Sequence, residues 1–172
     1  MNPHEDGAKR TVPATVVKVL THRREDRGMR LEEFTSRCVR VGEVHELVTT
    51  DQAGSAPGAR IDRVGFLGFA EIQGAGVIDR GDELWADGRL VGTVLGFDSC
   101  HFPNHYNVLI AVDALVTGPD LDLRPETAVS FRQATADTRT EAMDGHTGVV
   151  DSRTDRVDGR TARADRPVAA RS

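Results

Sequence analysis

Two short segments of the chain hold most of the side chains that could do chemistry. The first reads Ser36-Arg37-Cys38-Val39-Arg40-Val41-Gly42-Glu43-Val44-His45-Glu46-Leu47. Alternate side chains of a strand share a face, so Glu43 and His45 fall together, and Arg40 falls opposite them unless a bulge at Gly42 shifts the phase. A carboxylate beside an imidazole fixes its tautomer and raises its basicity, as a general base requires. The alternative is a Glu–His pair on a half-exposed strand with no function.

The second segment is a polar loop between two apolar stretches, Asp98-Ser99-Cys100-His101-Phe102-Pro103-Asn104-His105-Tyr106-Asn107. A connection alone does not need so many donors, acceptors and aromatic rings, so this loop is the best candidate site. His101 and His105 are four residues apart, but Pro103 between them prevents the helical face that makes this spacing a metal signature. The sequence therefore favours an acid–base or ligand-orienting role for these histidines.

The same residue types leave a metal site open as an alternative. Joining His45 to His101 and His105, with Glu43 or Cys100 as a further ligand, gives a set suited to zinc or iron. No recognised ligand spacing supports that set, so we expect no cofactor.

The two cysteines, Cys38 and Cys100, are expected to be free thiols of a cytosolic protein. His101 beside Cys100 would lower the pKa of the thiol and make it a nucleophile, whereas Asp98 would act in the opposite direction. The sequence favours a buried, unreactive Cys100 over a nucleophile.

Aromatic residues gather in the same part of the chain, because six of the eight lie between positions 66 and 106. Apolar walls with a few placed polar groups are typical of a small-molecule pocket, although a small domain also uses aromatic rings in its core. The catalytic candidates are His45, Glu43, His105, His101 and Asp98. The substrate-binding candidates are Arg40, Cys38, Cys100, Asn104, Tyr106, Asn107, Trp85 and Phe97.

Short strands must position these residues, since no stretch shows a convincing helical period. The candidate strands are 14–22, 38–49, 64–72, 82–86, 90–97, 106–112 and 127–131. Asp87-Gly88 predicts a tight hairpin. Only residues 25–34 could form a short helix, against which Gly28 counts. The sequence predicts a mainly β fold, a small and at least partly closed β-barrel of about six to eight short strands with at most one short helix.

The turn glycines of this region carry a resemblance to a known family. The motifs are Gly76-Val77-Ile78-Asp79-Arg80-Gly81-Asp82-Glu83-Leu84, Gly88, Val91-Gly92-Thr93-Val94-Leu95-Gly96, Asn104-His105-Tyr106-Asn107 and Thr117-Gly118-Pro119. Over roughly residues 64–131 they resemble the enzyme IIA component of the glucitol/sorbitol phosphotransferase system. The resemblance implies a small β-barrel that carries a phosphoryl group on histidine. Where that family has its histidine, this chain reads Gly65-Phe66-Leu67-Gly68-Phe69-Ala70-Glu71-Ile72, so the phosphocarrier role is not expected here.

Composition divides the chain of 172 residues into three parts. After Phe131 there is no Ile, Leu, Phe, Trp or Tyr. Such a segment cannot bury enough apolar surface to offset the entropy lost on folding. We predict a disordered N-terminus over 1–11, a β-barrel domain over 12–131 and a disordered tail over 132–172.

Charge and hydropathy limit the partners. Residues 1–129 hold 14 Lys and Arg against 20 Asp and Glu, a balance that disfavours nucleic acid. No run approaches the roughly 18 apolar residues of a membrane helix, and residues 1–10 lack the apolar stretch of a secretory signal. We expect a soluble, cytoplasmic protein that binds a small molecule, binds neither nucleic acid nor membranes, and forms a homo-oligomer that covers its strand edges.

These observations predict a small enzyme of specialised or carbohydrate metabolism that transfers protons on an organic substrate in a barrel pocket, as isomerases, cyclases and lyases do. His45 or His105 would be the base, Glu43 or Asp98 its orienting carboxylate, and Arg40 an anchor for an anion. The alternatives are a non-catalytic sugar- or metabolite-binding module related to the phosphotransferase IIA barrels, and a His-ligated metalloprotein.

Overall fold

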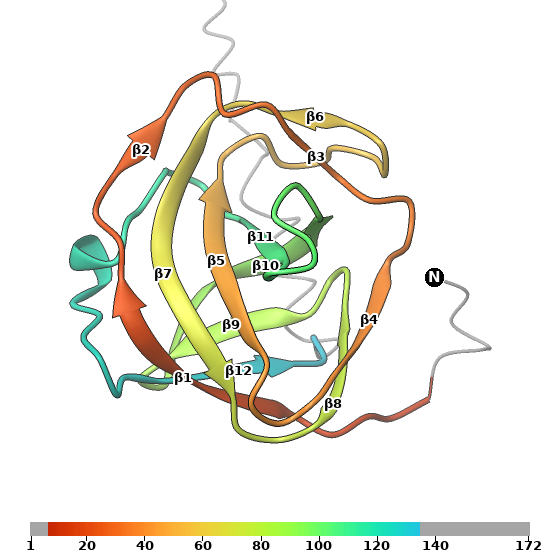
Figure 1. The fold of residues 1–172 in the computed structure, drawn as a ribbon, viewed down its shortest axis with the longest axis vertical. Coiled ribbons are helices and arrows are strands. Elements are labelled where there is room, and N and C mark those ends of the chain that lie inside the picture. The colour runs from red at the N-terminus through yellow and green to blue at the C-terminus, as the bar shows by residue number, and fades with distance from the viewer. Residues whose placement is uncertain (1–6, 135–172) are drawn as a thin grey trace, which may run out of the picture.

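The computed structural model describes residues 7–134, which form short strands joined by turns and loops (Figure 1). In chain order the elements are β1 (Val12–Val19), β2 (Arg23–Arg24), β3 (Met29–Arg30), β4 (Ser36–Val39), β5 (Val44–Thr50), β6 (Arg60–Ile61), β7 (Val64–Ile72), β8 (Gly76–Asp79), β9 (Glu83–Ala86), β10 (Arg89–Asp98), β11 (Asn107–Ala111), the 3-10 turn η1 (Pro119–Leu121) and β12 (Ala128–Arg132). Within this part of the chain, no helix has the length and apolar character that crossing a membrane would need.

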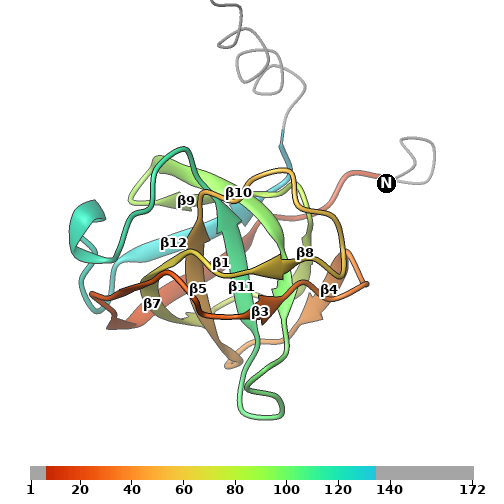
Figure 2. The ribbon, with the colours of Figure 1, turned by 90° about the horizontal axis from the view of Figure 1, so that it is seen from above.

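Seven of these strands close into a ring within one sheet (Figures 1 and 2). Their hydrogen-bonded order is β1, β12, β9, β10, β11, β5 and β7, and β7 pairs back with β1. All neighbours are antiparallel except β5 and β11, which run parallel. Each strand of the ring therefore has a neighbour on both sides, which is how closure removes open strand edges. The prediction of a mainly β fold with this number of strands is confirmed.

Apolar side chains divide between two clusters according to the alternation along the strands. The larger cluster takes side chains from all seven strands of the ring, among them Leu47 and Ile110, and fills the ring. The smaller cluster takes the neighbouring side chains Val48 and Leu109, which point the other way. The pair of strands β3 and β6 covers this outer face. Strands β5, β7 and β11, and the C-terminal half of β10, are consequently buried on both faces.

The short helix that the sequence allowed over 25–34 does not form. This segment contains β3, with Met29 opposite Ile61 of β6. Met29 and Leu31 are both buried in the smaller cluster, which is the two-residue period of a strand. Gly28 has a φ of 69°, outside the helical region. Covering the outer face of the ring decides the conformation of this segment.

The turns follow the predicted chemistry in one place and correct the prediction in another. Asp87 and Gly88 both have positive φ, 47° and 75°, as the tight turn between β9 and β10 requires. The predicted strand 38–49, in contrast, is two strands. A turn over residues 40–43, with Gly42 at a φ of 85°, separates β4, which pairs with β8, from β5.

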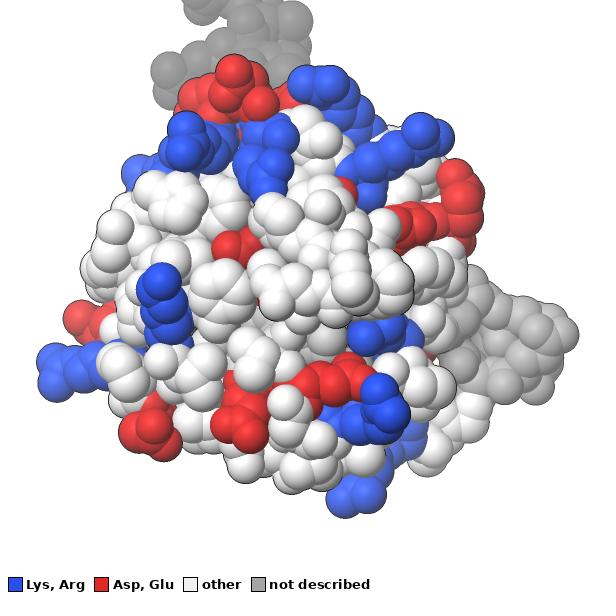
Figure 3. Space-filling view, viewed as in Figure 1, with Lys and Arg blue, Asp and Glu red and all other residues white. Residues whose placement is uncertain are grey.

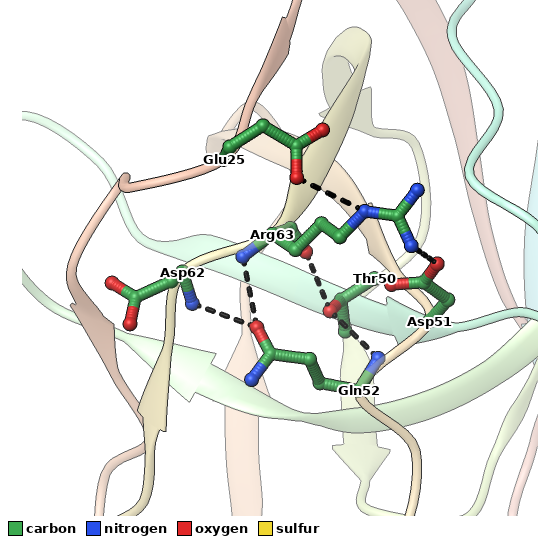
Figure 4. A network of polar contacts seen from close by, with 6 residues as sticks. All are labelled: Glu25, Thr50, Asp51, Gln52, Asp62 and Arg63. Atoms are coloured by element: carbon green, nitrogen blue, oxygen red, sulfur yellow. Dashed lines mark hydrogen bonds and ion pairs between the residues drawn. The ribbon is translucent and has the colours of Figure 1, made fainter.

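A polar network attaches the end of β5 to the start of β7 (Figure 4). The side-chain oxygen of Gln52 accepts the backbone N–H groups of Asp62 and Arg63, both at 2.8 Å. The hydroxyl of Thr50 donates to the carbonyl oxygen of Arg63 at 2.8 Å, and the Arg63 guanidinium donates to Glu25 at 3.1 Å. These bonds satisfy backbone groups between strands and hold the β3–β6 cover on the ring.

The predicted disordered segments, 1–11 and 132–172, lie outside the described residues except for 7–11 and 132–134. In the part that is described, the Lys9 ammonium forms ion pairs with the carboxylates of Asp79 and Asp82.

Charged side chains of both signs share the surface. On the face shown in Figure 3, Lys and Arg side chains alternate with Asp and Glu side chains around a largely uncharged centre. Seen from this side, the described residues do not form the concentrated basic face that phosphate binding favours.

Candidate functional site

The two segments that the sequence singled out converge at one end of the ring. Parallel pairing places the start of β11 beside the start of β5, with Asn107 opposite Glu46. The loop 99–106 precedes β11, and the backbone N–H of Glu46 donates to the carbonyl oxygen of Tyr106 at 3.1 Å. The loop therefore lies against the beginning of β5.

Asp98 fixes the base of this loop. Its buried carboxylate accepts the backbone N–H of Arg30 at 2.8 Å, the side-chain amide of Asn107 at 2.7 Å and the backbone N–H of Cys100 at 3.2 Å. Among the described residues, its hydrogen-bond partners do not include an imidazole. Asp98 and Asn107 thus hold the loop in place, and the structure does not place them as an orienting carboxylate and a ligand contact.

A groove of about 420 Å³ opens between the loop and the start of β5. Of its lining residues, the sequence had singled out Arg40, Glu43, His45, Asn104, His105 and Tyr106. Arg37 and Phe102 line it as well and were not among the predicted site residues.

Glu43 and His45 form a hydrogen-bonded pair in the wall of the groove. His45 Nε2 lies 3.0 Å from Glu43 Oε2. Arg40 Nε donates to Glu43 Oε1 at 3.2 Å, and a terminal nitrogen of Arg37 donates to Oε2 at 3.4 Å. The side chain of Glu43 is 20% exposed and that of His45 only 5%. Glu43 is therefore the member of the pair that a bound molecule can reach, and His45 lies behind it.

The charge state of the pair follows from its surroundings. Burial raises the pKa of Glu43, but the hydrogen bonds from His45 and Arg40 and the charge of Arg37 outweigh burial, so the pKa lies below its ordinary value. Burial lowers the pKa of His45 by more than its bond to Glu43 raises it. The pair is then a carboxylate that accepts Nε2–H from a neutral imidazole. The other ring nitrogen, Nδ1, is buried with no hydrogen-bond partner among the described residues.

Arg37 reaches the groove because β4 lies beside it. Its guanidinium carbon lies 3.8 Å from the centroid of the Tyr106 ring, a cation–π contact. Tyr106 also packs against Phe102, with ring centroids 5.5 Å apart. The alternation of side chains along a single predicted strand 38–49 does not predict that Arg37 lies in the groove. The position of Arg37 depends on the turn that separates β4 from β5.

His101 and His105 belong to a second cluster, together with Glu46. His101 Nδ1 lies 3.1 Å from His105 Nε2, which lies 3.9 Å from Glu46 Oε2. One ligand-type atom from each residue lies within 4.8 Å of the others. His45 is instead hydrogen-bonded to Glu43, so in the described part of the chain the three histidines do not form one cluster. Glu46 takes the position in the cluster that was expected for His45. Glu46 was not among the predicted site residues, because its position beside the loop depends on the parallel pairing of β5 with β11.

Cys100 lies beside this cluster. A terminal nitrogen of Arg27 lies 3.6 Å from Cys100 Sγ and 3.2 Å from His101 Nε2. Burial and then Asp98 raise the pKa of the Cys100 thiol, against the effect of Arg27. The thiol is thus less acidic than usual, which does not favour a nucleophile. Both cysteines are free, as predicted, but Cys100 as a whole residue is exposed, so the prediction that it is buried was wrong.

The other predicted ligand contacts lie away from the groove. Cys38 is exposed on β4. Trp85 of β9 donates to Glu83 at 2.8 Å. Phe97 is buried in the larger cluster and stacks on Phe34, with centroids 5.7 Å apart. For Phe97 the alternative use of aromatic rings, packing within the fold, describes what the structure shows. The Trp85 ring is only partly buried and lies under the Arg132 guanidinium, 4.7 Å from its centroid.

Comparison with known proteins gives a family. No curated protein and no solved structure matches the chain, and the resemblance to the phosphotransferase IIA barrels stays a prediction. A family model described as "Family of unknown function (DUF6917)" matches residues 6–132. This match spans the ring of strands, the groove and the Glu46 cluster. The chain belongs to the DUF6917 family.

Proposed function

We propose that the protein is a small-molecule enzyme that moves a proton on an anionic organic substrate bound in the groove between the loop 99–106 and β5. One observation carries the proposal: a partly exposed carboxylate, Glu43, accepts hydrogen bonds from an imidazole and two guanidinium groups in the same groove. Such a set offers an anion-binding pair and a proton acceptor within one site.

Arg37 and Arg40 would bind the anionic group of the substrate. A guanidinium group binds a carboxylate or a phosphate through paired hydrogen bonds, which a single bond to Glu43 does not satisfy. Arg37 is held over the Tyr106 ring, and the exposed Arg40 side chain contacts Glu43 through Nε. An anion entering the groove would compete with Glu43 for both arginines.

Proton transfer would follow from that competition. Glu43 with three donors is a weak base. When the substrate anion takes Arg37 and Arg40, Glu43 loses two of the three interactions that favour its charged form, and its pKa rises. Glu43 then accepts a proton from the bound substrate and returns it at another position, as an isomerase does. The exposures thus favour Glu43 as the group that meets the substrate and His45 as its positioning residue, the reverse of the roles expected first.

The same groove supports a second candidate, a non-catalytic binding module for a sugar or metabolite. The favouring observation is the aromatic wall, in which Phe102 is exposed beside Tyr106. An aromatic face and a carboxylate that accepts hydroxyl hydrogens are common in such sites.

A ligand panel tests the proposal. The full-length protein is screened against small organic acids, sugar phosphates and neutral sugars by thermal shift, and each stabilising compound is then incubated and followed by proton NMR. We expect an anionic compound to bind and to be converted. E43Q should keep binding and lose at least about 100-fold in turnover. R37Q should lose binding.

E71Q is the matched control, because Glu71 lies on the neighbouring strand β7 opposite Val44 and outside the groove. Binding without conversion would favour the binding module. Binding of neutral sugars alone, unchanged in R37Q, would contradict the anion site.

A further inference from the structure

A second site lies next to the groove, at the cluster of Glu46, His101 and His105. His105 Nε2 lies 3.1 Å from His101 Nδ1 and 3.9 Å from Glu46 Oε2. An ion with bonds of about 2.0–2.2 Å holds neighbouring ligand atoms about 3–3.5 Å apart. Adjustments of the order of 1 Å would therefore bring all three side chains onto one ion. His101 is exposed on the loop, where such an adjustment is least restricted.

One oxygen of the carboxylate in this cluster has no hydrogen-bond donor among the described residues. Glu46 Oε2 is buried and accepts no hydrogen bond from the described residues, and the Glu46 side chain is only 7% exposed. A buried carboxylate oxygen without a donor destabilises the fold, because it loses its hydrogen bonds to water and gains none from the protein. Oε2 points toward His105, the direction from which an ion held by the two imidazoles would reach it.

A positive charge already lies against the cluster. A terminal nitrogen of Arg27 lies 3.2 Å from His101 Nε2. A guanidinium group can only donate, so His101 Nε2 accepts and the ring proton sits on Nδ1, toward His105. An ion bound through Nδ1 would displace this proton to Nε2 and turn Arg27 away. Arg27 therefore competes with the ion.

The surroundings leave the cluster open on two sides. Glu46 and His101 line a depression of about 390 Å³ together with Arg27, and His105 lines the groove. Three protein ligands with open space around them are typical of an ion that keeps positions for water or substrate, whereas structural ions are closed by four ligands.

We propose that Glu46, His101 and His105 bind a divalent first-row transition-metal ion. Two imidazoles and one carboxylate suit zinc, and also iron(II) with open coordination positions. The inference goes beyond the proposed function, which rests on Glu43 and Arg37 and does not require the ion.

Metal titration of the full-length, untagged protein tests the site. After removal of bound metal with a chelator, Zn²⁺ is titrated by calorimetry, and Co²⁺ is added as a probe whose visible spectrum reports its ligands. We expect one ion per chain, bound more tightly than about 10 μM. E46Q and H105Q should each weaken Zn²⁺ binding by at least about 100-fold and change the Co²⁺ spectrum.

H22N is the matched control, because His22 lies in the same depression, stacked on Phe66, but outside the cluster. H22N and E43Q should bind Zn²⁺ like the wild type. R27A should bind it several-fold more tightly, a gain that a misfolded variant cannot imitate. Zn²⁺ binding that is absent in the wild type, or equal in wild type and E46Q, overturns the proposal. None of these readouts depends on turnover, so loss of the ion site would leave the proposed function standing.

Discussion

At the scale of single residues, three carboxylates near one another differ in the donors that face them. Glu43 accepts hydrogen bonds from three side chains and remains partly exposed. Asp98 is buried and accepts backbone and amide N–H groups. Glu46 has a buried oxygen with no donor among the described residues. These surroundings suit a proton acceptor, a loop anchor and a metal ligand respectively, although sequence spacing treats the residues alike.

Tyr106 supplies the first prediction, because its ring holds Arg37 in the groove. Y106L should weaken binding of the anionic ligand found in the panel by about 2- to 5-fold, the worth of a partly exposed cation–π contact. Y106F keeps the ring and should bind like the wild type. Calorimetric titration of that ligand checks both variants, and equal affinities for Y106L and Y106F would contradict the role given to the ring.

The residue types at the site could be predicted from the sequence, but only some of the contacts between their side chains could. Glu43 and His45 are two positions apart on one strand, so alternation brings them together. Arg40 joins them because residues 40–43 form a turn, which the proposed bulge at Gly42 only approximated. Arg37 depends on the separation of two strands and Glu46 on a parallel pairing, and local periodicity reports neither.

At the scale of elements, strands with long apolar runs were predictable and two-residue strands were not. The run 64–72 coincides with β7, and the predicted 127–131 lies within a residue of β12. In contrast, β3 and β6 exist because the outer face of the ring must be covered. That requirement is tertiary, and it overrode the helical interpretation of residues 25–34.

Gly68 of β7 gives a prediction about strand packing. Its φ is 149°, and an added Cβ would lie 2.1 Å from the carbonyl oxygen of Lys18 on β1. G68A should lower the free energy of unfolding by about 2–4 kcal/mol, because backbone must move. G88A, at a φ of 75° with open space around it, should cost only about 1–2 kcal/mol. Urea denaturation compares the two, and an equal loss in both would contradict the close approach of β7 and β1.

Asp120 in η1 gives a prediction about pH. Hydrogen bonds from the hydroxyl and N–H of Thr117, and from Arg23, lower the pKa of Asp120. A carboxyl whose pKa is lowered by folding stabilises the protein above its unfolded pKa of about 4 and loses this effect as the pH falls through its folded pKa. D120N should therefore be less stable than the wild type at pH 7, and the difference should shrink below pH 4.

Urea midpoints measured from pH 7 down to pH 2.5 check this dependence. A difference between D120N and the wild type that stays constant over the whole range would show that the charge of Asp120 makes no contribution.

At the scale of the whole molecule, closure of the ring supports the site and removes the reason for predicting a homo-oligomer. β12 completes the ring between β1 and β9, far from the groove in sequence. A closed ring gives rigid support to the loop 99–106 and to the start of β5. Open strand edges were the reason for expecting a homo-oligomer, and closure removes that reason, so oligomerisation stays a prediction.

Phe131 of β12 tests the closure. It is buried in the larger cluster between residues of β1 and β9, opposite Val12 and Leu84. F131A should lower the free energy of unfolding by about 3–5 kcal/mol. L90A, which truncates an exposed side chain of β10, should cost less than about 1 kcal/mol. Urea unfolding measures both, and a small effect of F131A would mean that β12 is dispensable to the ring.

Hydrogen exchange into a bound substrate tests the proton transfer at Glu43 most directly. In deuterium oxide, the wild type and E71Q should replace one carbon-bound hydrogen of the panel's anionic ligand with deuterium, followed by proton NMR. E43Q should bind the same ligand and exchange that hydrogen at least about 100-fold more slowly. Exchange by E43Q at the wild-type rate, or no exchange by the wild type in any ligand that it binds, would contradict the proposed function.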